Sequence, residues 1–348
     1  MIRVLFIVIT SGLLFSACNK DKDPVFEPMG LEAYDLVIPA GFPPMNIPAN
    51  NPLTKHGVAL GRKLFYDPIL SGDNTMSCGT CHVQEYGFTD RGFALSTGID
   101  GLTGTRNSMP IMNLGWDRRF FWDGGASDLE SQSIDPILNP LEMHEDLGNA
   151  LEELNNHPEY PALFQLVFGE TPIKTVHVMK AIAQFERTLI SGNSKYDKYL
   201  RGESSLTTQE LLGMEVFTAF DKGDCAHCHV LGSTFTDYEF KNNGLDSVYA
   251  DEGRFRITFN PDDVGKFKTP SLRNIEVTGP YMHDGRFSTL AEVIEHYNSG
   301  FAEHPNLDPL IAEHQRNRLT QEEKQALEDF LLTLTDHDFL TNPAFAAP

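Results

Sequence analysis

Apolar residues recur three and four positions apart in several stretches of this 348-residue chain, a spacing that places them on one face of an α-helix. The pattern is clearest over residues 174–190 and returns in shorter form at 61–65 and 213–217. The apolar stripe of the long stretch consists of Val178, Ile182, Phe185 and Leu189. Strand-like patterns are few and short, and residues 255–259 are one example. The chain is therefore predicted to be mainly α.

Capping boxes mark the starts of three predicted helices, because a Thr is followed three residues later by a Glu. The pairs are Thr207 and Glu210, Thr289 and Glu292, and Thr320 and Glu323. The last pair opens an amphipathic helix whose apolar face consists of Leu327, Phe330, Leu331 and Leu334. Long stretches rich in Gly, Pro and Asn separate the helices and are predicted loops. Gly, Ser and charged residues interrupt the helical pattern at 191–205, where we place a domain boundary.

Residues 1–17 have the pattern of an export signal peptide. Arg3 precedes an apolar run that is too short for a permanent membrane-spanning helix, and small residues then lead to Cys18. A Cys in this place is typical of lipoprotein processing, which would leave Cys18 lipidated on the periplasmic side of the cell envelope. Ordinary signal cleavage near the same point is the alternative. The charged and Pro-rich residues 18–50 then predict a solvated tether.

Acidic residues outnumber basic ones, with 49 Asp and Glu against 27 Lys and Arg. This balance argues against nucleic acid as a partner and against electrostatic attraction to anionic lipid. It favours encounter with a basic partner such as a basic electron-carrier protein, although solubility alone also explains an acidic surface. The length allows two domains of ordinary size, each with its own core.

Four of the five cysteines form two Cys-x-x-Cys pairs, and a histidine directly follows each pair. The motifs are Cys78-Gly-Thr-Cys81-His82 and Cys225-Ala-His-Cys228-His229. This is the attachment pattern of c-type haem. Two thiols about one helical turn apart reach the two vinyl groups of one porphyrin, and the adjacent imidazole becomes the proximal iron ligand.

Three other kinds of site share parts of this pattern. A redox dithiol usually opens a helix in a βαβ context, which the chain lacks. A zinc site would need further ligands at finger-like spacings, and a structural disulfide explains neither histidine. We therefore predict covalent haem at both motifs. Because a helical segment leads into each motif, the fold class expected is two cytochrome c-like helical domains joined by long loops.

With these motifs in place, the chain resembles the bacterial di-haem cytochrome c peroxidases and the related MauG-type enzymes. The likeness extends from about residue 51 to residue 336, and the matching segments are 121–125, 139–143, 181–189, 267–274 and 280–285. The resemblance implies a peroxidatic domain at 51–195 and an electron-transfer domain at 196–337. A tail at 338–348 would follow.

The resemblance also assigns roles in the peroxidatic domain. Glu142 matches the distal carboxylate beside the peroxidatic iron, and Gln132 and Pro136 fall at the other distal-pocket positions. Such a carboxylate can move a proton between the two peroxide oxygens, and burial raises its pKa toward the working pH. Trp122 matches the tryptophan that lies between the two haems, although an indole there could also be part of the core.

A calcium ion between the domains is a further implication of the resemblance. Asn107, Thr278 and Pro280 match the positions that hold it. Calcium takes oxygen ligands, including backbone carbonyls, so a proline is an acceptable contributor.

Two positions depart from the typical peroxidases. Ile99 stands where a histidine would cap the peroxidatic iron, so we expect an open iron site that needs no reductive activation. Tyr297 stands fourteen residues after His283, where the typical peroxidases have a methionine and MauG-type enzymes have a tyrosine ligand. Tyr297 is thus the expected sixth ligand of the second haem, with Met282 as a rival.

Three functions follow from these features. The main expectation is a peroxidase that reduces hydrogen peroxide to water with electrons from a small cytochrome c or cupredoxin. A MauG-type oxidase that uses peroxide to oxidise residues of a partner protein is the first alternative, and both departures favour its chemistry. A non-catalytic di-haem electron carrier is the second, although a carrier gains nothing from an open iron. A homodimer is compatible with each of them.

Overall fold

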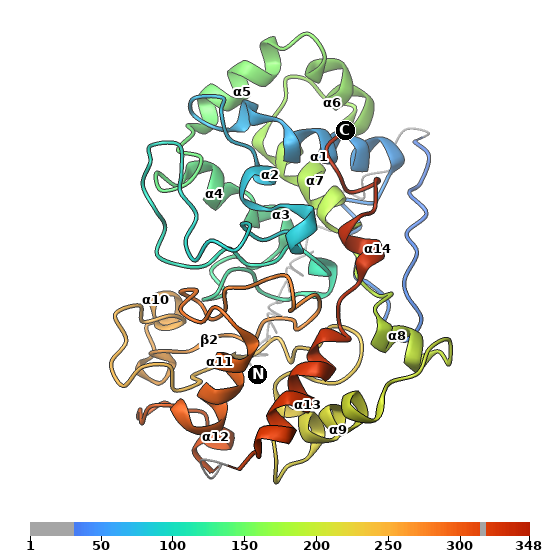
Figure 1. Ribbon diagram of the computed structural model, residues 1–348. Coiled ribbons are helices and arrows are strands. Elements are labelled where there is room, and N and C mark those ends of the chain that lie inside the picture. Colours follow the sequence, from blue (N-terminus) through green and yellow to red (C-terminus); the bar gives the residue numbers. More distant parts are fainter. Residues whose placement is uncertain (1–30, 314–317) are drawn as a thin grey trace, which may run out of the picture.

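The computed structural model describes residues 31–313 and 318–348, and its ordered elements are nearly all helices. They form two halves, one above the other in Figure 1. Two short strands, β1 (Phe240–Lys241) and β2 (Phe267–Lys268), pair antiparallel. The mainly α prediction is confirmed. The predicted signal peptide and Cys18 lie outside the described residues, and no helix within those residues is long and apolar enough to cross a membrane.

The helices follow the order of the duplicated motifs. Those of the first half are α1 (Lys55–Tyr66), α2 (Cys78–Cys81), α3 (Leu129–Gln132), α4 (Ile134–Leu138), α5 (Leu147–Asn156), α6 (Tyr160–Phe168) and α7 (Thr175–Glu186). Those that follow are α8 (Lys195–Leu200), α9 (Thr208–Thr218), α10 (Phe255–Thr258), α11 (Leu290–Glu295), α12 (Pro309–Glu313), α13 (Gln321–Leu332) and α14 (His337–Leu340). A π-helical turn, η6 (His296–Gly300), continues α11.

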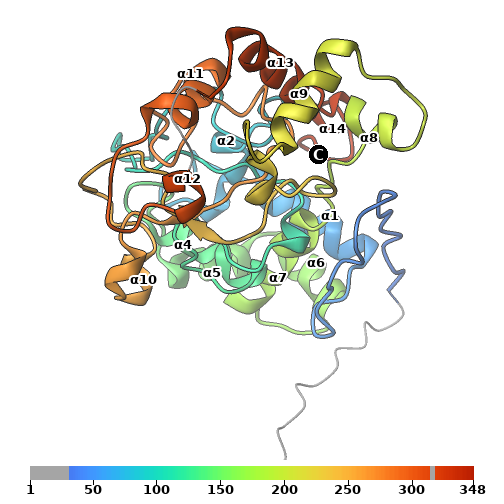
Figure 2. The same ribbon diagram turned by 90° about the horizontal axis from the view of Figure 1, so that it is seen from below.

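Each half is built on one close helix crossing with a glycine at its centre. In the first half a Cβ on Gly61 of α1 would lie 1.9 Å from the carbonyl oxygen of Ala181 in α7. In the second half a Cβ on Gly213 of α9 would lie 1.9 Å from that of Ala326 in α13. Figure 2 shows α9 and α13 side by side. The two halves therefore repeat one packing solution, which only glycine permits at this approach.

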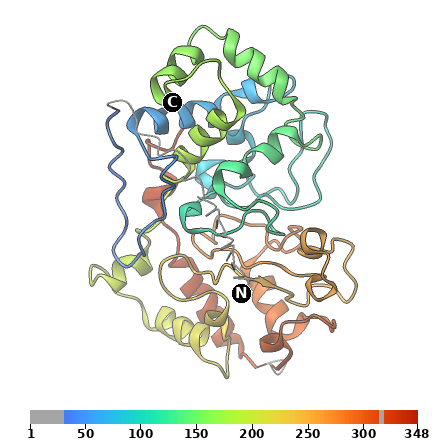
Figure 3. The same cartoon turned by 180° about the vertical axis from the view of Figure 1, so that it is seen from behind.

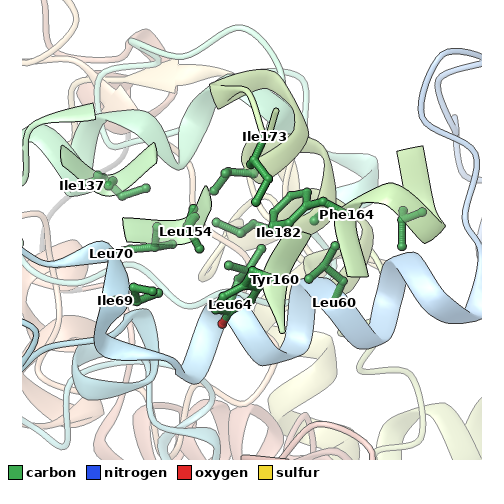
Figure 4. Close-up of a cluster of buried hydrophobic side chains, with 14 of the residues drawn as sticks. Leu60, Leu64, Ile69, Leu70, Ile137, Leu154, Tyr160, Phe164, Ile173 and Ile182 are labelled. Carbon is green, nitrogen blue, oxygen red and sulfur yellow. The ribbon is translucent and has the colours of Figure 1, made fainter. Parts of the chain in front are cut away.

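Aromatic and aliphatic side chains fill the space around each crossing. The Phe65 and Phe185 rings lie 5.3 Å apart in the first half, and the Phe217 and Phe330 rings lie 5.3 Å apart in the second. Figure 4 shows part of the first core, in which side chains from α1, α5, α6 and α7 are directed toward one another. Burial of these side chains is the main stabilising contribution to each half.

The local sequence signals are mostly confirmed. All three capping boxes form, at the starts of α9, α11 and α13. The long helix predicted at 174–190 ends earlier as α7 and continues in tight turns that still bury Leu189. The strand predicted at 255–259 is wrong, because these residues form the single helical turn α10. Phe255 and Phe259 lie four apart, and their rings pack 6.1 Å from each other across that turn.

Two segments predicted to stand apart from the domains are packed against them. In the described part of the predicted tether, residues 31–50, the backbone N–H of Tyr34 bonds Leu53 and the Pro43 carbonyl accepts a 2.9 Å bond from Trp116. Figure 3 shows this segment running along both halves. The tail, 338–348, returns to the first half and buries apolar side chains there. The predicted boundary at 191–205 contains α8.

Candidate functional site

The first Cys-x-x-Cys-His motif is a helical turn that leads into a buried imidazole. Helix α2 starts after Ser77, whose N–H bonds the Thr80 hydroxyl at 3.0 Å. His82 follows the helix, and its Nδ1 lies 2.7 Å from the carbonyl oxygen of Phe88. A carbonyl only accepts, so Nδ1 carries the proton and Nε2 is left with its lone pair. Burial lowers the pKa of His82, which favours the neutral form that binds a metal.

The second motif repeats this arrangement. Residues Cys225–His227 form a 3-10 turn, and His229 Nδ1 lies 3.2 Å from the carbonyl oxygen of Phe235. Burial lowers the pKa of His229 as well. The four thiols are free, and burial raises the pKa of Cys78 and of Cys225 to about 12.

A cavity of about 730 Å³ opens beside the first motif. This volume lies within the roughly 300–1,000 Å³ typical of cofactor sites. Among the residues that line it, His82 is the only histidine. The other site residues predicted from sequence that line it are Glu142, Gln132, Pro136, Trp122 and Asn107. Thiol, imidazole and cavity together fit a c-type haem.

The carboxyl group of Glu142 is half-buried at this cavity. It lies in the turn after α4 and accepts a 2.7 Å hydrogen bond from Asn139 Nδ2. Burial raises the pKa of Glu142; the Asn139 hydrogen bond opposes this rise and the nearby charge of Asp135 adds to it. A carboxyl with a raised pKa beside a ligand cavity is suited to proton transfer.

Ile99 is held away from this cavity. Its backbone N–H donates a 2.9 Å bond to the carbonyl of Glu142, and its Cδ1 lies 3.4 Å from the place where a Cβ on Gly72 would stand. Ser96, Thr97 and Gly98 of the same loop do line the cavity, but Ile99 does not. The loop therefore presents no imidazole opposite His82.

The second motif has a smaller cavity of about 220 Å³. Both thiols and His229 line it, together with Tyr297 and Met282. This set of two thiols and an imidazole fits haem c.

Tyr297 has 39 % of its surface exposed, but this surface faces the cavity, and burial raises the pKa of its phenol to about 12. Asn243 Nδ2 donates to the Tyr297 hydroxyl at 3.3 Å and lies 3.4 Å from the sulfur of Met282. The phenol lies on η6 rather than on a regular α-helix. Single π-helical turns are frequent at functional sites.

Trp122 lines both cavities and is 9 % exposed. Its Nε1 donates a 2.9 Å hydrogen bond to the carbonyl of Asn107, and its own carbonyl accepts from the N–H of Lys268 at 2.8 Å. Asn107, Thr278 and Pro280 all line the second cavity, so the structure brings the three predicted calcium ligands to one place. The described residues contain no cluster of three or more His, Cys, Asp or Glu suited to a metal ion.

Two residues at the sites, Asn139 and Lys268, could not be predicted from the sequence. Asn139 sets the environment of Glu142, and Lys268 lines both cavities while forming a buried ion pair with Asp117. Asn139 and Lys268 both lie within segments shared with the family. The contacts that give them a role join residues far apart along the chain, or depend on a particular turn, so periodicity could not reveal them.

Comparison with known proteins places these sites in a family. The sequence model described as Di-haem cytochrome c peroxidase matches residues 55–205. Methylamine utilization protein MauG of Methylorubrum extorquens is 39% identical over 293 residues, covering 82% of this chain and 80% of that protein. Cytochrome c551 peroxidase of Nitrosomonas europaea is 36% identical over 269 residues, covering 74% of this chain and 78% of that protein.

One solved structure is similar to this chain over most of its length. The crystal structure of a MauG-like protein associated with microbial copper homeostasis superposes with a TM-score of 0.83 at 35% sequence identity. The match covers 91% of this chain and 99% of that one. The chain therefore belongs to the di-haem cytochrome c peroxidase and MauG family, which implies two haem c groups.

Proposed function

We propose that this protein is a di-haem peroxidase that reduces hydrogen peroxide to water with electrons from a small redox protein. The observation that carries the proposal is the first cavity, where a carboxyl with a raised pKa, Glu142, shares the lining with a single histidine, His82. A proton-transfer group and an unobstructed coordination site are what peroxide reduction needs. Relatives named cytochrome c peroxidase support the assignment.

The protein's own residues would control where protons go. Haem at the two sites supplies the redox chemistry, in which peroxide takes up two electrons and two protons and gives two waters. Glu142 as carboxylate accepts the proton of the near peroxide oxygen and returns it to the leaving oxygen. Gln132, which also lines this cavity, offers an amide donor, and Pro136 limits the space. Trp122 contacts both cavities and provides an aromatic path for electrons.

Electron paramagnetic resonance of the ferric protein, before and after peroxide, tests this proposal. We expect a high-spin signal from the first haem and a low-spin signal from the second, with rapid loss of both on addition of peroxide. Two low-spin signals that ignore peroxide until the protein is half-reduced would contradict the open site. The protein would then act as a reductively activated peroxidase or as a carrier.

A MauG-type oxidase is the second candidate function. Tyr297 at the second cavity and the 39% identity to a protein named MauG favour it. In that case the oxidising equivalents would be used on residues of a partner protein rather than returned by a small donor. Product analysis separates the two: steady peroxide turnover with a reduced cytochrome c or cupredoxin supports the peroxidase.

Other parts of the proposal rest on the sequence and the family. The acidic balance of the chain favours a basic donor protein. Lipidation of Cys18 would hold the protein on the periplasmic side of the envelope, and mass spectrometry of the mature N-terminus tests it. Asn107, Thr278 and Pro280 would bind calcium between the domains; chelation should then lower the melting temperature, and calcium should restore it. A homodimer stays compatible with this scheme.

A further inference from the structure

Helices α8 and α14 hold equivalent places in the duplicated order of the chain. Each follows the helix that packs on a central glycine: α8 follows α7, and α14 follows α13. Each then leaves its own half and packs on the other. In Figure 1, α14 leads up from α13 to the first half, while α8 lies beside α9 of the second. We call these two helices, with the residues that follow α14, the crossed straps.

The α14 strap covers the loop that follows the first haem motif. The Phe339 ring lies 5.6 Å from the ring of Phe88, and both side chains are buried in one cluster with Leu340 and Phe345. Gln84, between His82 and Phe88, donates 2.9 Å hydrogen bonds to the carbonyls of Phe339 and Asn342. The strap is thus bonded to the loop both by side-chain packing and through its backbone.

The α8 strap covers the corresponding loop of the second half. Tyr196 is 1 % exposed, and its ring lies 5.4 Å from that of Phe235. Asp197 forms two 2.8 Å bonds with Arg273, and Arg273 in turn donates to the carbonyl of Ser233, within the loop between His229 and Phe235. The same kind of contact therefore recurs, with an aromatic ring on the phenylalanine and a polar link to the loop.

Both covered phenylalanines have backbone conformations that need support. Phe88 has φ of 60° and Phe235 has φ of 53°, in the left-handed region that bulky residues rarely adopt. Such residues persist only where the surroundings over-determine their conformation. Their carbonyl oxygens are the acceptors for Nδ1 of His82 and of His229. The orientation of each imidazole thus depends on a backbone group that a strap from the other half holds in place.

We propose that the crossed straps are positioning elements for the two proximal histidines, and that Phe339 and Tyr196 are their central residues. The inference rests on the proposed role of His82 and His229 as iron ligands. The hydrogen bond on the second imidazole nitrogen fixes the orientation and basicity of a metal-bound histidine. Each half would therefore set the ligand field of the other half's haem, which links the two sites through the chain itself.

Replacement of each strap aromatic in the holoprotein tests the proposal. Phe339→Ala should shift the high-spin resonance of the first haem and its iron–imidazole stretching band in resonance Raman, while the second haem's signal stays as in the wild type. Tyr196→Ala should do the reverse. Phe339→Leu, which keeps most of the volume, should restore the first signal in large part. It also gives a readable variant if Phe339→Ala does not fold.

Leu340→Ala is the matched control, because Leu340 lies on the same strap and in the same buried cluster. It should lower the melting temperature without shifting either signal. The proposal is overturned if Phe339→Ala and Leu340→Ala lose the same stability and leave both signals unchanged, or if each strap variant shifts both haems equally. These readouts report iron ligation and not turnover. A wild-type protein that does not react with peroxide but has histidine-ligated haem would refute the proposed function. The strap variants would still test the positioning of the two histidines in that protein.

Discussion

The indole Nε1 of Trp122 donates a 2.9 Å hydrogen bond to the carbonyl oxygen of Asn107, and the N–H of Asn107 donates a 2.7 Å bond to the carbonyl of His283. This chain of bonds joins the loop that carries Trp122 in the first half to a segment that lines the second cavity. The indole is consequently fixed in the wall between the two cavities. An aromatic side chain held rigidly between the two cavities is suited to carry electrons from one to the other.

Trp122→Phe should slow electron exchange between the two haems while leaving haem content unchanged. Phenylalanine is harder to oxidise than tryptophan, and it lacks the N–H group that bonds the Asn107 carbonyl and holds the side chain in place. Stopped-flow absorbance after a peroxide pulse measures the exchange. Trp116→Phe is the control, since Trp116 lines neither cavity and bonds the Pro43 carbonyl. Equal exchange rates in Trp122→Phe and the wild type would exclude the indole as the path.

Glu142→Gln should keep both haems and reduce the rate of peroxide reduction by about 10²–10⁴-fold, the usual worth of a general acid–base group. In the proposed mechanism the reactive form of Glu142 is the carboxylate. The wild-type rate should therefore rise with pH through the raised pKa of Glu142 and fall when the group is protonated. In the variant this acid limb should vanish. Near-normal turnover of Glu142→Gln would remove the residue from the mechanism.

Asn139→Ala should move that acid limb to higher pH. The Asn139 amide donates to the Glu142 carboxylate and so lowers its pKa; without this bond, burial and the charge of Asp135 raise the pKa further. The pH profile of kcat/KM measures the shift. A limb that moves to lower pH, or does not move, would mean that another group titrates in this range.

Tyr297→Phe should change the low-spin signal of the second haem and raise its midpoint potential, because a phenolate ligand favours the ferric state. Redox titration followed by absorbance measures the potential. Tyr281→Phe is a matched control: Tyr281 also lines the second cavity, but its hydroxyl donates to the Ile275 carbonyl. If Tyr297→Phe behaves like this control, Met282 becomes the ligand to test next.

Gly61→Ala should destabilise the first half strongly, since the new Cβ would lie 1.9 Å from a backbone oxygen in α7. Overpacking of a core lowers the free energy of unfolding by about 1–3 kcal/mol. The loss for Gly61→Ala should lie at the upper end, because the backbone carbonyl of Ala181 cannot rotate away as a side chain could. Chemical denaturation of the holoprotein measures the loss in the free energy of unfolding. Gly104→Ala, whose Cβ would have no neighbour closer than 4.0 Å, should be close to neutral.

The local chemistry of this protein could be predicted from its sequence. Haem attachment needs two thiols and an imidazole within five consecutive residues, and a capping box needs a Thr and a Glu three apart. Such signals are complete in a short stretch, so both motifs and all three boxes could be recognised without a fold. The short strand predicted at 255–259 failed because a few apolar residues suit one helical turn equally well.

Only the tertiary structure decided how the halves share their sites. Trp122 lines two cavities, and a backbone hydrogen bond joins Glu142 to the loop that carries Ile99, through contacts between residues distant in the chain. The residues of the crossed straps fall mainly in the predicted domain boundary at 191–205 and the predicted tail at 338–348. A short helix that packs on another half has too few residues for amphipathic periodicity to show which surface it will bury.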